Sequence, residues 1–260
     1  MFLKLVKHEL WELGRLLLPL FGGLLVLAGV ARGSIWLISS GSSSLVKVLG
    51  TMMIGIFILG AVASVVVTMV LIVQRFARSV HGDEGYLTHT LPVGTHAILL
   101  SRLLVSFLAV VLSLLIAWLS FRICVYKVDA VAQIGSLFSY LIEEAQIDTD
   151  RLLTLGVAST VVGALTTILQ IFAAISIGHS FNSGKVGKSF LFYVALAIAA
   201  GLLKGTLNSV LESTHLLDSA GKLMDQAVFS AWYGLGLNLV FGGIYYFLTW
   251  LMTRRHLNLA

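Results

Sequence analysis

Long runs of apolar residues, separated by short polar segments, make up most of the chain. Six of these runs are long enough to cross a membrane, because a helix that rises about 1.5 Å per residue needs roughly 20 apolar residues to span about 30 Å of hydrocarbon. The pattern predicts an all-α integral membrane fold with six transmembrane helices. Their expected ranges are 16–38, 48–73, 98–124, 152–177, 190–211 and 228–252.

The segment before the first run, residues 1–15, is amphipathic. Its apolar residues recur at helical spacing, and charged residues lie between them: Leu3, Val6, Leu10 and Leu13 alternate with Lys4, Lys7, Glu9 and Glu12. This pattern, together with Trp11, favours an interfacial helix on the inner leaflet. The alternative is a simple extension of the first membrane helix into water.

Two further segments suggest short helices on the outer face. The first has an apolar stripe that ends in two acidic residues: Val131, Ile134, Phe138, Leu141 and Ile142, then Glu143 and Glu144. The second, from Thr206 to Met224, is expected to lie along the outer leaflet or to re-enter it between the fifth and sixth membrane helices.

Composition agrees with a membrane protein. Only 11% of the residues are charged and 58% are hydrophobic, whereas soluble domains carry roughly 25% charged residues. The net charge of +5 arises from basic residues between the apolar runs, so it does not indicate a nucleic-acid partner. With the N-terminus inside, ten basic residues fall in inner segments and six in outer ones, which predicts that both termini are cytoplasmic.

One motif resembles a phosphate-binding loop but fails its requirements. The segment Gly178–Ser189 reads GHSFNSGKVGKS, and the motif needs a glycine five residues before Gly187-Lys188-Ser189, where Asn182 stands. A membrane helix also precedes the segment, where the motif requires a strand. We therefore expect a flexible basic inner loop, and no ATP hydrolysis by this chain.

Metal chemistry has one candidate cluster. His81, Asp83, Glu84 and His89 lie within nine residues, but their spacing does not match a zinc peptidase helix. The single cysteine, Cys124, excludes an internal disulfide and favours a small apolar role near a helix end. No metal or other bound cofactor is expected.

The fifth predicted helix contains one charge, Lys204. Such a lysine either snorkels to the outer headgroups or faces a substrate path. Beside it, Ala197, Gly201 and Gly205 recur every four residues, a pattern that favours close packing against another helix, including one from a second subunit.

The inner loop between the second and third membrane helices, residues 75–97, is the most specific stretch. Asp83 can cap a short helix, Pro92 can end it, and Thr95 can cap the helix that follows. This predicts a short helix held crosswise below the membrane. Its apolar tip, available to a partner, would consist of Tyr86, Leu87 and Leu91.

The run GDEGYLTHTLPV, followed by a helix that starts HAILLSRLL, resembles permease subunits of ATP-binding-cassette exporters of the second type (ABC-2). The tail from Arg254 to Leu259 resembles their short basic ends, and six membrane helices after an N-terminal interfacial helix agree along nearly the whole chain. The acidic outer stretch from Asp129 to Asp150 is a departure from this resemblance and does not assign the chain to a subgroup.

The resemblance implies a permease dimer, here expected to be a homodimer in a bacterial plasma membrane, with each half docked on a separate ATPase subunit that binds ATP and magnesium. The loop would be the coupling helix, and the second and fifth membrane helices would line the dimer interface and export path. Its contacts with the ATPase would come from Asp83, Glu84, Gly85, Tyr86, Leu87, Leu91 and Pro92.

The leading hypothesis is therefore a permease that exports a hydrophobic or amphipathic substrate, such as an antimicrobial peptide, and is not itself an enzyme. Two alternatives stay open. One is an intramembrane metal-dependent enzyme that uses the cluster from His81 to His89, and the other is a non-transporting sensor or assembly subunit.

Overall fold

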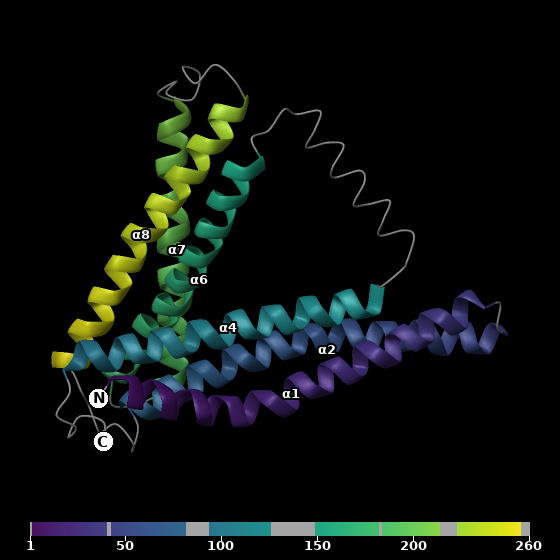
Figure 1. Ribbon diagram of the computed structural model, residues 1–260. Coiled ribbons are helices and arrows are strands. Elements are labelled where there is room, and N and C mark those ends of the chain that lie inside the picture. The colour runs from purple at the N-terminus through teal and green to yellow at the C-terminus, as the bar shows by residue number, and fades with distance from the viewer. Residues whose placement is uncertain are drawn as a thin grey trace. The chain divides into compact units, whose positions relative to one another are not determined.

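The computed structural model describes residues 2–40, 43–81, 94–125, 149–181, 184–213 and 223–255. These residues form long helices (Figure 1). The helices are α1 (Phe2–Ser39), α2 (Ser44–Phe76), α4 (Thr95–Val125), α6 (Thr149–His179), α7 (Lys185–Ser213) and α8 (Leu223–Arg255), and a π-helical turn, η1 (Ala77–His81), directly follows α2.

Six helices in the described chain are long and apolar enough to cross a membrane, as the sequence predicts. The apolar stretches are Leu5–Ser39, Ser44–Val80, Thr95–Val125, Thr154–His179, Lys185–Val210 and Val228–Arg254. Hydroxyl groups within them bond to carbonyl oxygens of their own helix, as Thr68 does to Ser64 and Thr253 to Thr249. Such bonds satisfy polar groups where water is absent. The chain is thus a multi-pass, all-α membrane protein.

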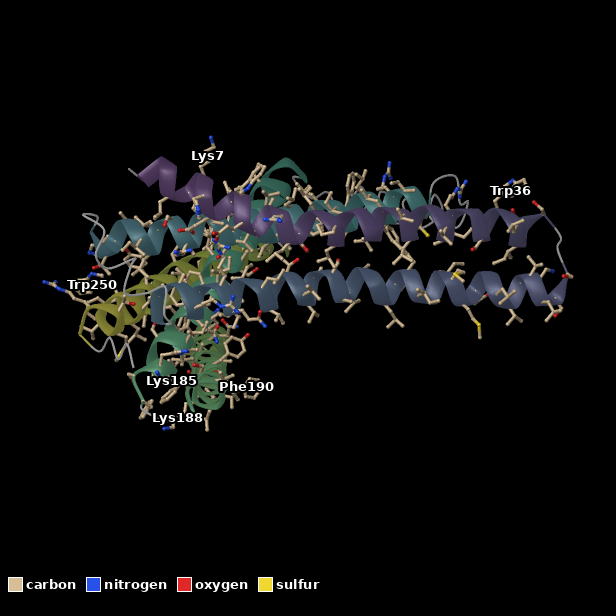
Figure 2. The ribbon with its side chains drawn as sticks, turned by 90° about the horizontal axis from the view of Figure 1, so that it is seen from below. Lys7, Trp36, Lys185, Lys188, Phe190 and Trp250 are labelled. Atoms are coloured by element: carbon tan, nitrogen blue, oxygen red, sulfur yellow. The ribbon has the colours of Figure 1, made fainter. Side chains whose placement is uncertain are left out.

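The first helix corrects one sequence boundary. A separate interfacial helix over residues 1–15 is not observed, because α1 continues from Phe2 to Ser39 with Pro19 inside it. The ribbon of α1 nevertheless changes direction in its N-terminal part (Figure 2), as expected when a proline removes one backbone hydrogen bond. Lys7 and Trp36 lie near opposite ends of this helix (Figure 2).

Other helix ends also differ from the expected ranges. Residues 75–81 belong to α2 and η1, so the loop expected over 75–97 begins later, and residues 95–97 already belong to α4. Residues 206–213 continue α7, and Leu223 and Met224 begin α8, so most of the expected re-entrant segment consists of helix ends. The outer-face helix expected over residues 131–144 lies outside the described residues.

The described chain forms two compact units. The first contains α1, most of α2 and α4 from Leu104 onward. Small residues let these helices approach closely: a Cβ atom on Gly60 would lie 3.1 Å from Leu27 Cδ1. Cys124 is buried in this core, in agreement with the apolar role expected for it. The buried core residues are Leu24, Ala28, Ala31, Phe57 and Cys124.

The second unit contains α6, α7 and α8, together with the end of α2, η1 and the start of α4. Helix α6 packs against both α7 and α8. Half of its most apolar stretch is buried, which makes it the central helix of the unit. The buried core between α6 and α8 consists of Leu169, Ala173, Phe241 and Tyr245.

Candidate functional site

The predicted ATPase-contacting residues, Asp83 to Leu91 and Pro92, lie outside the described residues. The structure does describe both flanks of their loop. On the entering side, the ring of Phe76 at the end of α2 stacks on that of Phe172 in α6, with centroids 3.8 Å apart and ring planes 5° from parallel. Both side chains are buried, as is Val80 in η1. The loop therefore begins from a point that is packed on α6.

On the leaving side, the loop ends at the start of α4, which contacts α8. His96 Nδ1 lies 2.7 Å from the Tyr246 hydroxyl oxygen, and the His96 ring stacks on Trp250 with centroids 5.4 Å apart. The carbonyl of Gly94 accepts hydrogen bonds from the amides of Ala97 and Ile98. Gly94, not Thr95 as expected, therefore caps α4. The two flanks together connect the loop to α6 and α8.

Lys204 has a hydrogen-bonding partner on another helix of the second unit, and its expected roles, snorkelling or facing a substrate path, stay predictions. Its Nζ donates a hydrogen bond of 2.8 Å to Asn238 Oδ1 in α8 and lies 5.1 Å from the centroid of the Phe241 ring. The lysine head therefore lies against α8 within the second unit.

Asn238 also joins α8 to α6. Thr166 Oγ1 lies 2.9 Å from the backbone oxygen of Asn238 and 2.8 Å from that of Val162. Thr166 is only 7% exposed. Thr166, Asn238 and Lys204 therefore form a polar cluster that connects α6, α8 and α7 within the second unit. Sequence reasoning found Lys204 but had no means of pairing it with a residue 34 positions away.

The small-residue face of α7 has no close neighbour in the described chain. Ala197, Gly201 and Gly205 are all exposed, and a Cβ atom on either glycine would meet nothing within 4 Å. The adjacent face, which includes Leu196 and Ala200, packs on the α6–α8 core instead. A helix from a second subunit on the small-residue face stays a prediction.

The segment Gly178–Ser189 is mostly helical, which corrects the expected flexible loop. Helix α6 ends at His179 and α7 begins at Lys185, so the connection is short. Gly184 adopts a φ of 67° and its carbonyl accepts a hydrogen bond from the Lys188 amide. Glycine suits this left-handed conformation because it lacks a Cβ atom. The segment forms a tight α6–α7 hairpin.

The hairpin contains a serine and a histidine that could suggest nucleophilic catalysis. Ser189 Oγ lies 3.4 Å from His179 Nδ1, but it donates to the Lys185 carbonyl at 2.9 Å. His179 Nδ1 lies 2.9 Å from the Ile175 carbonyl, which can only accept, so this nitrogen carries the hydrogen. A protonated Nδ1 cannot remove a proton from Ser189, so this pair does not form an activated nucleophile. The contacts of His179 and Ser189 instead stabilise the hairpin.

The described residues contain no group of three or more His, Cys, Asp or Glu side chains that could hold a metal ion. The candidate cluster from the sequence is not tested by this, since the side chain of His81 and all of Asp83, Glu84 and His89 lie outside the described residues.

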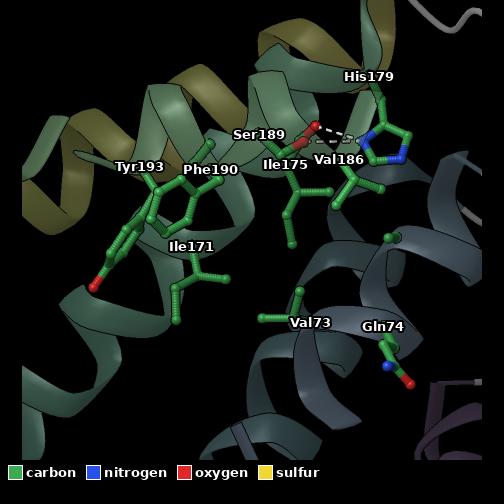
Figure 3. Close-up of a pocket in the computed structure, with 11 residues that line it drawn as sticks. Val73, Gln74, Ile171, Ile175, His179, Val186, Ser189, Phe190 and Tyr193 are labelled. Carbon is green, nitrogen blue, oxygen red and sulfur yellow. Dashed lines mark hydrogen bonds between the residues drawn. The ribbon is translucent and has the colours of Figure 1, made fainter. Parts of the chain in front are cut away.

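Sequence reasoning missed one feature, a cavity of about 390 Å³ in the second unit (Figure 3). Small-molecule sites range over about 300–1,000 Å³. The end of α2, η1, the end of α6 and the start of α7 all contribute to its walls. Eleven residues line it: Val73, Gln74, Ala77, Ile171, Ala174, Ile175, His179, Val186, Ser189, Phe190 and Tyr193.

Small side chains in the wall, such as those of Ala77 and Ala174, make room for this cavity. Nothing in the sequence shows that the segments containing them come together. Comparison with known proteins found no matching family model, no curated protein and no solved structure.

Proposed function

We propose that the chain is the membrane-spanning permease subunit of an ATP-driven exporter of the ABC-2 type. It acts as a dimer, expected to be a homodimer, in a bacterial plasma membrane with both termini in the cytoplasm. ATP and magnesium bind to separate ATPase subunits. Three observations support the proposal. They are the GDEGYLTHTLPV motif, the six membrane helices, and the contacts that connect the flanks of the motif's loop to α6 and α8.

The observation that carries the proposal is that the loop's two flanks belong to the unit that contains α6, α7 and α8. Phe76 joins the first flank to α6 through Phe172, and His96 joins the second to α8 through Tyr246. Stacked aromatic rings and a short hydrogen bond resist independent movement of the loop. A displacement of the loop by an ATPase would therefore be passed to α6 and α8.

The proposed mechanism is a change between two states of the ATPase dimer. ATP binding closes that dimer, and the loop follows because its contacts differ between the closed and open states. Tyr86 and Leu87 supply apolar contact, and Asp83 and Glu84 pair with basic groups on the ATPase. The apolar membrane helices suit a hydrophobic or amphipathic substrate, because a free metal ion would require charged ligands along its path.

Co-purification tests this function directly. The chain is expressed with its neighbouring genes, extracted in detergent and isolated through a tag on this chain. We expect a soluble subunit that bears a phosphate-binding loop to be recovered in equal amount, with ATPase activity. Recovery of the chain alone, without any ATPase, would contradict the proposal.

The double substitution Tyr86→Ala and Leu87→Ala is expected to release that ATPase. Loss of two central apolar contacts weakens an interface by about 2 kcal/mol or more, or roughly 30-fold in Kd. The measurement is the ATPase recovered per permease at several protein concentrations. The matched control, Val131→Ala with Phe138→Ala, removes apolar side chains from the expected outer segment and should leave recovery unchanged. Equal recovery from both variants would remove the coupling assignment.

A further inference from the structure

The polar cluster of Thr166, Asn238 and Lys204 carries a positive charge that the described chain does not neutralise. Lys204 Nζ donates to an uncharged acceptor, Asn238 Oδ1, at 2.8 Å, and Lys204 makes no other hydrogen bond and no ion pair with the described residues. The acidic residues of α6, α7 and α8 all lie in the first or last turn of their helices: Asp150, Glu212 and Asp225. Along α7, Glu212 is about 12 Å from Lys204.

The ammonium group of Lys204 lies within the apolar stretches of the second unit. Its partner Asn238 is about 15 Å along α8 from Val228, where the apolar stretch of that helix begins. Lys204 itself is about 9 Å along α7 from Val210, where the stretch of that helix ends. A charge in such surroundings is costly unless an opposite charge accompanies it. The amide of Asn238 supplies an acceptor but no negative charge, so an anion is the group that the cluster lacks.

The hydrogen-bonding groups that remain in the cluster are donors. An ammonium group has three N–H bonds. One of them is directed to Asn238, and the Phe241 ring centroid lies 5.1 Å from Nζ. The side-chain nitrogen of Asn238 is also a donor, and it has no acceptor in the part of the chain that the structure describes. A carboxylate or a phosphate, which only accepts and is negatively charged, matches these two neighbouring nitrogens.

The lysine is accessible on one side of α7. Lys204 is half-buried. The neighbouring Gly201 and Gly205 are exposed, and a Cβ atom on either would meet nothing within 4 Å, so no side chain at these positions covers the lysine. Leu203 and Leu207, which are exposed on the same helix, are apolar. A molecule with an anionic group and an apolar chain therefore finds a partner for each part here.

We propose that Lys204 and Asn238 form a binding site for the anionic group of an amphipathic molecule, a carboxylate or a phosphate attached to an apolar chain. Lys204 supplies the charge. Asn238 orients the ammonium group and donates a further hydrogen bond. The apolar chain lies along α7 beside its exposed leucines. Because the site lies within the second unit, it does not require the exporter function.

Tryptophan quenching by a spin-labelled fatty acid tests the site in the whole protein. The reporter is Leu207→Trp, one turn from Lys204 on the same side of α7, and the control reporter is Leu202→Trp, on the opposite side. Each variant is reconstituted in phosphatidylcholine nanodiscs at mildly alkaline pH. It is titrated with stearic acid that carries a nitroxide near its carboxyl group, and with the uncharged methyl ester of the same probe. The signal of the unsubstituted protein, which has five tryptophans, is subtracted.

We expect the acid to quench the reporter at position 207 with about tenfold higher apparent affinity than the ester, the ratio that one hydrogen bond to a charged group produces. The reporter at position 202 should show no such preference. In the position-207 reporter, Lys204→Met should remove the preference. Asn238→Asp should remove it as well, because the new carboxylate pairs with Lys204 and takes the place of the ligand's anion. A purely structural contact between α7 and α8 would be kept in this second variant.

A second arm of the experiment identifies the source of the anion. Phosphatidylglycerol that carries the nitroxide on an acyl chain replaces the fatty acid, and equally labelled phosphatidylcholine replaces the ester. A preference for the anionic lipid that depends on Lys204 would support the site with the bilayer as its source. A preference confined to the fatty acid would support it with a single-chain amphiphile as its occupant.

Two results would overturn the proposal. Equal quenching by the acid and the ester at position 207 would show that no anion is held beside the lysine. A preference for the acid that survives both Lys204→Met and Asn238→Asp would show that other groups bind it. Neither result bears on whether an ATPase co-purifies, so failure of this site and failure of the exporter function are distinguishable.

Discussion

Replacement of Gly178 by alanine is expected to destabilise the α6–α7 hairpin by about 3 kcal/mol or more, at or beyond the upper end of the range for overpacked cores. An added Cβ atom would lie 2.5 Å from the Ser189 backbone nitrogen and 2.6 Å from Ser189 Cα, and it would also collide with Ser189 Oγ. Because two of these atoms belong to the backbone, a side-chain rotation cannot relieve the contact. The helices themselves would have to separate.

The measurement is unfolding of the purified protein by SDS titration, followed by circular dichroism. Gly187→Ala is the matched control, because a Cβ atom there meets nothing within 4 Å. In a helix, alanine is favoured over glycine by up to about 1 kcal/mol, so this variant should be as stable as the unsubstituted protein or more so.

A second variant shows which atoms cause the effect. Adding Ser189→Ala to Gly178→Ala removes the collision with Oγ but leaves both backbone contacts. We therefore expect little recovery of stability. Equal stability of Gly178→Ala and Gly187→Ala would mean that the two helices do not approach each other at Gly178.

The number and approximate positions of the membrane helices were predictable because they follow from local properties. A run of about 20 apolar residues has few alternatives to a helix in lipid, since every backbone polar group must be bonded within the segment. All six predicted ranges fall within helices of the structure. Helix ends were less predictable. Gly14 and Arg15 mark a change in composition, but neither prevents α1 from continuing.

The hairpin shows how composition can suggest too long a loop. Gly178, Asn182, Gly184 and Gly187 are residues common in loops, yet Gly178 and Gly187 lie inside helices. Gly178 is required by a close approach to another helix and Gly184 by its backbone conformation. The sequence alone does not distinguish a glycine that permits close helix packing, such as Gly178, from one that permits a turn, such as Gly184.

The candidate sites depend on contacts between distant residues, and these were the least predictable. The cavity arises where four segments from α2, η1, α6 and α7 converge. Lys204 was identified because a charge in a membrane helix is unusual, but its partner on another helix was not predicted. The structure supplies one in Asn238. This pairing changes what a substitution should do.

Asn238→Leu is expected to destabilise the second unit by about 2–3 kcal/mol, because the Lys204 ammonium would lose its hydrogen-bond acceptor within a membrane helix. Lys204→Met should cost less, about 1 kcal/mol, since an amide left without its partner is less costly than a charge. In the double variant both polar groups are gone. Its loss of stability should be smaller than the sum of the two single losses.

The difference from that sum measures the Lys204–Asn238 interaction, for which we expect about 1–2 kcal/mol of coupling. Stability is again measured by SDS titration. Asn208→Leu, an identical substitution at an exposed position of α7, should change stability by no more than about 0.5 kcal/mol. Additive losses in the double variant would contradict the contact. A coupled loss, with the control unchanged, would show that the lysine joins α7 to α8 through Asn238.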